Sequence, residues 1–306
     1  MQTQKREEID LIEIAKVIWQ SKFLITIIVS FFSICSILYS LSINNLYTSS
    51  ALLQVKDSEN NGALQNMSSS FGGLASLAGV SLPSSSSNKT DYVVETIKSR
   101  DFLKHLLTFD NVRENIFASE SYDHKNKTII YDSEIFNATS KKWVRTKPTN
   151  RNQIPSYLEI YRIYRKDLTI SVDDESGFIS LSFTHLSPKF ANQFLNLIVQ
   201  EVNLLSKERD LEESQSALNF LEEQLLEVRQ NEIRESMYQL IESQLETKML
   251  ANVRKDYLIS FIDESYIPEV KSYPKRAIIV LITFMVSLTF SVLLVLIRHF
   301  TFRNTN

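Results

Sequence analysis

The sequence predicts a membrane-anchored α+β protein, in which two transmembrane helices flank an outward-facing α/β base domain with a long extended helical hairpin. Three observations lead to this fold class. An uncharged apolar stretch lies near each end of the chain, segments with strand-like alternation occur among helical ones between them, and neither Gly nor Pro occurs between Pro188 and Pro268. These features fit two spans, a mixed base domain and a long uninterrupted helical region.

The overall composition excludes few classes of protein. The chain has 306 residues, of which 43% are hydrophobic, and its 33 Lys and Arg against 36 Asp and Glu give a formal net charge of -3. A nucleic-acid-binding protein usually carries a basic excess, so we expect no nucleic acid as a partner.

The two apolar stretches, residues 23–43 and 277–297, contain no charged residue. Each holds about 20 residues, which is the length of a helix that crosses a bilayer. The first stretch has the alternative of a cleaved signal peptide. It starts late, follows an acidic amphipathic segment and lacks a small-x-small cleavage site, so a retained membrane helix is the favoured interpretation.

The charges beside the two spans predict their orientation. Basic residues occur in both short tails, 1–22 and 298–306, and the positive-inside rule therefore places the tails in the cytoplasm. Lys275 and Arg276 lie on the opposite flank, but a long loop crosses the membrane largely regardless of its charge. Residues 44–276 are therefore expected to face outward. The single cysteine, Cys35, lies in the first span, so no disulfide is expected in the outward part.

The base domain is expected over residues 44–187 and begins with a strand at 46–55. A Gly/Ser-rich segment, 61–89, follows. It reads either as a mobile loop whose small apolar centre (Leu74, Leu77 and Val80) can dock, or as a disordered linker. Apolar residues at helical spacing predict a helix over 91–109, capped by Thr90 or Asp91.

The second half of the base domain is less regular. Residues 110–154 have no firm period and their fold is left open, although 128–136 has some strand character. A short helix with a proline near its first turn is predicted over 154–166. Two alternating segments, 167–172 and 178–185, surround the sequence DDESG and predict a hairpin. The acidic triplet can in principle bind a cation, but turn chemistry is the favoured explanation.

A long helical hairpin is predicted over residues 188–256, starting at Pro188 with Ser187 as cap and bending near 229–234. The stretch around Leu211 is almost entirely polar, so the helix is expected to leave the core there and to stand in solvent or against other chains. The hairpin is either a self-contained coiled coil or one wall of a ring of identical subunits, and the second reading is favoured. The predicted assembly seam consists of Leu218, Leu221, Leu225, Val228, Met237, Ile241, Leu245 and Met249.

The segment 257–276 is expected to form a return strand, with YLISFID beside the first strand, and then a connector into the second span. Proline fixes its own φ and restricts the residue before it, so Pro268 and Pro274 are expected to stiffen the connector. Lys275 and Arg276 are expected to anchor its end at the lipid headgroups.

Motifs for catalysis and for cofactors are absent from the sequence. The four histidines, His105, His124, His185 and His299, are scattered without metal-ligand spacing. No phosphate-binding G-x-x-x-x-G-K motif and no G-x-S-x-G elbow occur. We therefore expect no catalytic residue, no cofactor and no metal, and do not expect an enzyme.

Taken together, these features resemble the Wzz-type chain length determinants, the polysaccharide co-polymerases of bacterial inner membranes. The stretches that carry the resemblance are EIDLIEIAKVIWQSKFLI, YTSSALLQV, GLASLAGV, VVETIKSRDFLKHLL and FIDESYIPEVKSYPKRAII. The connector departs from the family in one respect, because Val270, Lys271 and Ser272 stand where a third proline is common.

The resemblance implies a protein of the bacterial inner membrane whose main domain lies in the periplasm. It implies a ring-shaped homo-oligomer without catalysis of its own, which acts with a Wzy-type polymerase to set the modal length of O-antigen or a related glycan. The implied partners are other copies of the chain, the polymerase, the growing undecaprenyl-linked polysaccharide and membrane lipid.

Two alternatives remain. The protein can be a related co-polymerase or export component for capsule or exopolysaccharide. It can also be a two-span periplasmic sensor, but a sensor needs an output domain and only RHFTFRNTN follows residue 297.

Overall fold

The computed structural model describes residues 11–56, 86–146 and 152–303. The chain forms two compact units, one of Tyr47–Val270 and one that combines the segments on either side, up to Leu46 and from Lys271. Each is described by itself below. The predicted loop centre at Leu74, Leu77 and Val80 lies outside the described residues.

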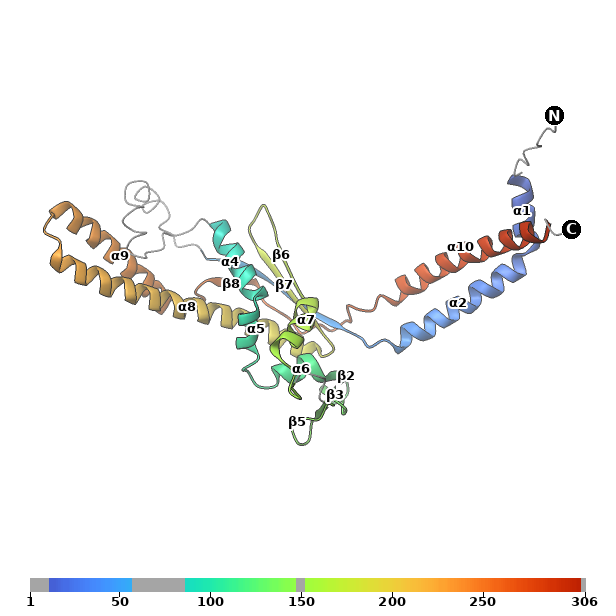
Figure 1. Cartoon of the computed structure of the whole chain (residues 1–306), viewed down its shortest axis with the longest axis horizontal. Coiled ribbons are helices and arrows are strands. Elements are labelled where there is room, and N and C mark those ends of the chain that lie inside the picture. The colour runs from blue at the N-terminus through green and yellow to red at the C-terminus, as the bar shows by residue number, and fades with distance from the viewer. Residues whose placement is uncertain (1–10, 57–85, 147–151, 304–306) are drawn as a thin grey trace, which may run out of the picture. The chain divides into compact units, whose positions relative to one another are not determined.

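The unit formed by the two chain ends consists of helices α1 (Leu11–Gln20), α2 (Lys22–Ser42) and α10 (Arg276–Arg303). Helices α2 and α10 lie side by side (Figure 1), and both are long and apolar enough to cross a membrane. The Ser36 hydroxyl donates a hydrogen bond to Thr283 Oγ1 across the pair, at 3.1 Å. The two apolar stretches therefore form paired helices, as expected for two spans.

The other unit is built on a four-stranded antiparallel sheet in the order β6-β7-β1-β8. Its strands are β1 (Tyr47–Val55), β6 (Leu168–Val172), β7 (Ile179–His185) and β8 (Ile259–Asp263). Alternate residues of β1 are buried, which is the pattern of a strand with one face on the core. The predicted first strand, the β6–β7 hairpin and the return strand beside β1 are all confirmed.

The DDESG segment between β6 and β7 forms a turn. Asp173 Oδ1 accepts hydrogen bonds from both the backbone N–H and the hydroxyl of Ser176, each at 2.7 Å. These bonds lower the pKa of the Asp173 carboxyl. Gly177 has φ +69°, a left-handed conformation that glycine adopts without steric cost. The turn reading therefore accounts for this acidic segment.

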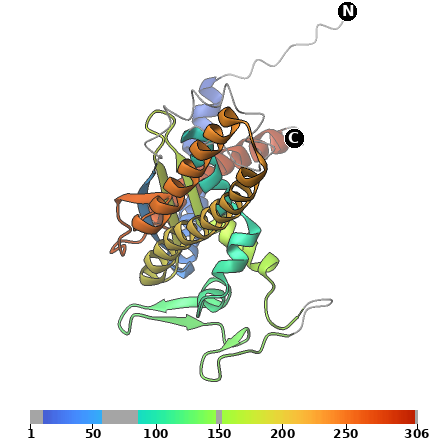
Figure 2. The ribbon, with the colours of Figure 1, turned by 90° about the vertical axis from the view of Figure 1, so that its left-hand side faces the viewer.

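Helix α8 (Pro188–Glu227) begins where predicted, because the Ser187 hydroxyl accepts a hydrogen bond from Phe190 N at 3.2 Å. The first half of α8 packs on β1 and β7 and buries Phe194, Ile198 and Val202 in the core of this unit. After a bend at 228–230, α9 (Asn231–Val253) returns along α8 (Figures 1 and 2). The 40 residues of α8 extend about 60 Å at 1.5 Å per residue.

The single helix predicted over 91–109 is wrong. The structure has two helices, α4 (Ser86–Lys98) and α5 (Arg100–Leu106), and the first begins before Thr90 and Asp91. Ser99 lies between the two helices and has an extended backbone. Its hydroxyl accepts a hydrogen bond from Phe102 N at 3.1 Å. Serine favours this capping geometry over a helix interior, so it ends one helix and starts the next.

The region left open by the sequence contains several short elements. They are α6 (Val112–Ala118), β2 (Ser119–Asp123), β3 (Thr128–Tyr131), β4 (Phe136–Asn137) and β5 (Lys142–Trp143). Strands β2 and β3 pair, as do β4 and β5. The predicted short helix after them is α7 (Tyr157–Asp167), which starts with a reciprocal capping box between Ser156 and Glu159.

Candidate functional site: the connector and the helical hairpin

The four predicted connector residues lie in two different units. Pro268 is buried within the unit of Tyr47–Val270. Pro274 and Arg276 are half-buried, and Lys275 is exposed, in the unit that contains α10. The coupling role predicted for these residues stays a prediction.

The two segments that enter and leave the paired helices are fastened to each other. Leu46 and Tyr273 form an isolated antiparallel bridge, with Leu46 N donating to Tyr273 O at 2.9 Å. Leu46 O accepts from Ser272 N at 2.8 Å. Three residues after Tyr273, Arg276 Nη2 donates to Asn45 Oδ1 at 3.2 Å. This clasp fixes the start of α10 against the segment that follows α2, and no periodic pattern predicted it.

A second set of polar contacts holds the return segment against α8. The Asn203 amide Oδ1 accepts from Leu258 N at 2.7 Å and Ile259 N at 2.9 Å, and its Nδ2 donates to Ile259 O at 2.9 Å. Nearer the start of α8, Asn192 Nδ2 donates to Ser265 Oγ at 2.6 Å. The buried Asn203 side chain thus forms three hydrogen bonds with the backbone of Leu258 and Ile259, which holds the start of β8 against α8.

These asparagines share one side of α8. Ser265 also donates to Asn196 Oδ1 at 2.9 Å, and Ser49 Oγ on β1 donates to Tyr266 O at 2.7 Å. The spacing Asn192, Asn196 and Asn203 corresponds to one helical face, and this spacing was the signal available in the sequence. The segment just before the connector is thus positioned by side chains of the long helix.

The predicted assembly seam divides by burial. Leu218, Leu221 and Met237 are buried between α8 and α9. Leu225, Val228 and Ile241 are half-buried. Leu245 and Met249 are 52% and 57% exposed.

The apolar stripe of α9 therefore does not face α8 along its whole length. Ala251 is fully buried near the end of α9, whereas Val253 is 78% exposed. A strict four-residue step from Met237 drifts around a helix of 3.6 residues per turn, so Leu245 and Met249 rotate out of the contact with α8. In the single chain, the stripe is thus only partly covered by α8. A role of its members in assembly stays a prediction.

The polar stretch of α8 around Leu211 has partners within the same chain. The Arg209 guanidinium lies over the Tyr92 ring at 4.5 Å, and Tyr257 OH donates to Asp210 Oδ2 at 2.7 Å. Burial, followed by the bond to Asp210, raises the pKa of the Tyr257 hydroxyl. The stretch leaves the apolar core as expected, since none of residues 207–217 belongs to the core cluster. The expectation that it stands in solvent or against other chains is corrected, because polar and ring contacts fasten it to α4 and to the segment before β8.

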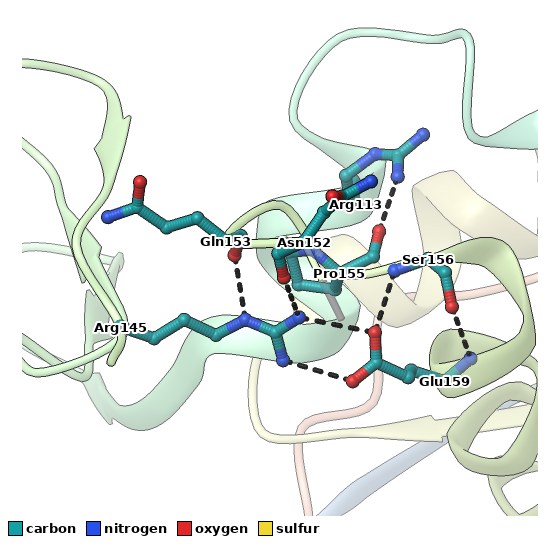
Figure 3. A network of polar contacts seen from close by, with 7 residues as sticks. All are labelled: Arg113, Arg145, Asn152, Gln153, Pro155, Ser156 and Glu159. Carbon is teal, nitrogen blue, oxygen red and sulfur yellow. Dashed lines mark hydrogen bonds and ion pairs between the residues drawn. The ribbon is translucent and has the colours of Figure 1, made fainter. Parts of the chain in front are cut away.

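A further polar network lies in the region whose fold the sequence left open (Figure 3). Arg145 forms a two-pronged ion pair with Glu159, with N–O distances of 3.1 and 3.2 Å. The same guanidinium donates to the carbonyls of Asn152 and Gln153, and Arg113 donates to the carbonyl of Pro155. Because Arg145 Nη1 and Nη2 hold a carboxylate that also caps α7, the network fixes the approach to that helix.

The described histidines have local partners instead of forming a cluster. His105 Nε2 lies 2.6 Å from Glu201 Oε2, and His124 Nε2 lies 3.2 Å from Tyr47 OH. The His185 ring is buried, accepts from Ser187 N through Nδ1 and contacts Asn115 O through Nε2. Among residues 11–56, 86–146 and 152–303, no group of three or more His, Cys, Asp or Glu side chains is arranged to hold a metal ion.

Residues 7–108 match the family model described as "Wzz: Chain length determinant protein". Comparison with solved structures found a full-length bacterial polysaccharide co-polymerase, with 14% identity and a TM-score of 0.45, covering 97% of this chain and 99% of that chain. It also found a fragment of WzzB, a polysaccharide co-polymerase from Salmonella Typhimurium, with 16% identity and a TM-score of 0.31, covering 75% of this chain and 100% of that chain.

None of the curated proteins compared with the chain is a significant match. The matched region of the family model contains α1, α2, β1, α4 and α5, which includes the first apolar helix and the strand that follows it. The resemblance drawn from the sequence is confirmed by the match of residues 7–108 to the Wzz chain length determinant model.

Proposed function

We propose that this protein is a non-catalytic regulator of polysaccharide chain length that acts with a Wzy-type polymerase on an undecaprenyl-linked glycan. The observation that carries the proposal is the family match over residues 7–108, whose description names chain length determination. The paired apolar helices α2 and α10 support a membrane location. In the proposed arrangement they span the bacterial inner membrane, with Tyr47–Val270 in the periplasm and both tails in the cytoplasm.

The regulator would act by binding and not by chemistry. Several copies of the hairpin would form a ring whose surface holds the growing glycan, and the paired helices would contact the polymerase. The exposed Leu245 and Met249 support the assembly part of the proposal, because they are apolar side chains that the single chain leaves uncovered. Pro268, Pro274, Lys275 and Arg276 would couple the ring to the membrane helices.

The decisive experiment is a gel of surface polysaccharide from a strain that lacks the gene, beside the same strain with the gene on a plasmid. The proposal requires that deletion turns a clustered length distribution into a random spread, and that the plasmid restores the cluster. An unchanged O-antigen distribution together with a loss of capsule or secreted polymer would instead assign the protein to export of those polymers.

The coupling role is tested by Pro268→Ala and Pro274→Ala in the complemented strain. Each substitution frees the backbone of one connector position, so the modal length should shift while the amount of protein in the membrane fraction stays the same. An unchanged modal length in both variants would remove the connector from the mechanism.

The assembly role is tested by Leu245→Ser and Met249→Ser, with Leu226→Ser as the matched control. Leu226 is 88% exposed near the hairpin bend and is not a member of the predicted seam. The seam variants should dissociate the oligomer in size-exclusion chromatography with light scattering, and the control should keep it. Equal behaviour of all three variants would contradict the seam.

A further inference from the structure

The paired helices α2 and α10 form an open groove next to the clasp at Asn45 and Arg276. Its volume is about 690 Å³. Apolar side chains form most of its walls, among them Ile37, Val280 and Leu281. Three polar side chains also line it: Ser33, Ser40 and Arg276. An apolar groove with a cation at one end is the shape of a site for an amphipathic ligand.

The polar atoms on this groove are not satisfied within the described part of the chain. Ser33 Oγ, Ser40 Oγ and Arg276 Nε are buried and have no hydrogen-bond partner there. Ser40 lines the groove but is only 1% exposed, and its hydroxyl is buried. A buried donor without a partner costs free energy, so these three atoms point to a ligand that brings acceptor oxygens.

The charge of the site specifies the head of the ligand. Arg276 is bound to the neutral amide of Asn45, and no ion pair to it is formed among the described residues. It also lies at the first residue of α10, where the helix dipole favours an anion. A phosphate group supplies both the negative charge and several acceptor oxygens, and it matches the geometry of a guanidinium.

The walls specify the rest of the ligand. Ser33 lies seven residues before Ser40 on α2, which places it about 10 Å deeper along the helix. The groove between these levels is lined by aliphatic side chains, so it suits a hydrocarbon tail and not a free phosphate ion. A helix from a second copy does not supply the anion, because the two apolar stretches contain neither Asp nor Glu.

We propose that the groove between α2 and α10 binds an anionic phospholipid of the surrounding bilayer, with its phosphate on Arg276 and Ser40 and a tail along Val280 and Leu281. The inference depends on the two helices spanning a membrane, but not on the protein regulating chain length. The lipid would complete the polar contacts of the clasp and fix the two helix ends in the plane of the headgroups.

The proposal is tested with the full chain purified in detergent and titrated with phosphatidylglycerol, with bound lipid measured by native mass spectrometry. Arg276→Gln removes the charge and should weaken binding about tenfold or more, as loss of a charged hydrogen bond does. The matched control is Lys275→Gln, which removes one charge at the neighbouring, exposed position outside the groove and should leave affinity within about twofold.

A second variant protects the test against misfolding of the first. Leu281→Trp keeps Arg276 but fills the groove from an exposed position, and it should also abolish binding. Asn45→Ala breaks the clasp without removing the charge and should retain the lipid. Equal lipid binding by Arg276→Gln and Lys275→Gln would overturn the proposal, as would binding that Leu281→Trp leaves intact.

Two other occupants are distinguished in the same experiment. Competition by a polyprenyl phosphate at concentrations well below those of phosphatidylglycerol would replace the phospholipid with the glycan carrier and overturn the proposal. Loss of lipid binding in oligomers, with binding retained in monomers, would assign the groove to a helix of a second copy. A failure of chain-length regulation in the gene-deletion experiment would leave all these outcomes unaffected.

Discussion

The two halves of helix α8 show how one continuous helix can be held in two different ways. The first half, up to Ser206, buries Phe194, Ile198 and Val202 on the sheet and uses Asn203 to hold β8. The second half has only Leu218 and Leu221 as buried apolar residues. Burial of apolar area therefore fixes the first half, whereas polar contacts and a narrow apolar strip hold the second.

This difference indicates which surface remains available for other molecules. A helix that buries a wide apolar face has few apolar side chains left for other molecules, but α9, which pairs with the far half of α8, keeps Leu245 and Met249 exposed. We expect stability to depend on the first half and assembly to depend on the second.

The largest expected effect contrasts two phenylalanines of α8. Phe194 is 1% exposed and Phe220 is 43% exposed. Phe194→Ala should lower the free energy of unfolding by about 3–5 kcal/mol, because it leaves a cavity in the core, whereas Phe220→Ala should cost less than about 1 kcal/mol. Denaturant unfolding followed by circular dichroism measures both. Similar losses of unfolding free energy for the two variants would show that both halves of α8 depend equally on apolar burial.

Asn203 and Asn219 allow the same comparison for polar side chains, because they lie in the first and second half of α8. Asn203→Ala removes three buried hydrogen bonds to Leu258 and Ile259 and should cost about 2–3 kcal/mol of unfolding free energy. Asn219 is exposed and bonds only Gln215 in the described structure, so Asn219→Ala should be nearly neutral. The same unfolding assay applies. A cost for Asn203→Ala below that of Asn219→Ala would show that β8 is held by the sheet alone.

His185 is the last residue of β7, next to the start of α8, and it makes the free energy of unfolding sensitive to pH. Burial lowers the pKa of the His185 ring to about 4, from 6.5 in the unfolded chain. The unfolded state therefore binds more protons between these values, and the stability that the neutral ring provides above pH 6.5 is lost as the pH falls. At pH 5 the loss should be about 2 kcal/mol relative to pH 7.

The effect of His185 is measured as a difference from His185→Gln, which does not titrate in this range. Subtraction is needed because burial raises the pKa of Asp167 to about 6, which acts in the opposite direction over the same pH interval. Parallel pH profiles for the parent protein and the variant would exclude His185 as the cause of acid sensitivity.

The smallest expected effect lies in the far half of the hairpin. Lys248 Nζ donates to Gln215 Oε1 at 2.6 Å between α9 and α8, at an exposed position. Lys248→Ala should change the unfolding free energy by less than about 0.5 kcal/mol, because water replaces an exposed bond of this kind at little cost. A loss above about 2 kcal/mol would mean that polar contacts govern the far half more strongly than its apolar strip.

Much of the fold was predictable from periodicity. Strand alternation identified β1, β6 and β7, and aromatic and β-branched content identified β8. Pro188 with Ser187 identified the start of α8, because local chemistry and tertiary burial agree there. Ser99 was missed because the apolar spacing of residues 91–109 continues across it, and only the hydrogen bond to Phe102 N reveals that one helix has ended.

The candidate site was less predictable. Long-range polar contacts such as Arg276 to Asn45 and Asn192 to Ser265 join residues far apart in the chain. The spacing of the asparagines places them on one helical face, but no local pattern identifies their partners. How much of the α9 stripe contacts α8 was also not predictable, because residues spaced four apart rotate around a helix of 3.6 residues per turn. Pairing of Arg145 with Glu159 likewise depends on a loop whose course the sequence did not suggest.

The sheet order also determines when this protein can finish folding. Strand β1 lies in the interior of the sheet, between β7 and β8, yet Val55 pairs with Ile259 near the far end of the unit. Contacts of such high sequence separation form slowly. One edge of β1 must therefore stay unpaired, and able to pair with a foreign strand, until β8 has been synthesised. The hairpin that precedes β8 relies on local contacts, so we expect it to form first and deliver the last strand to its place.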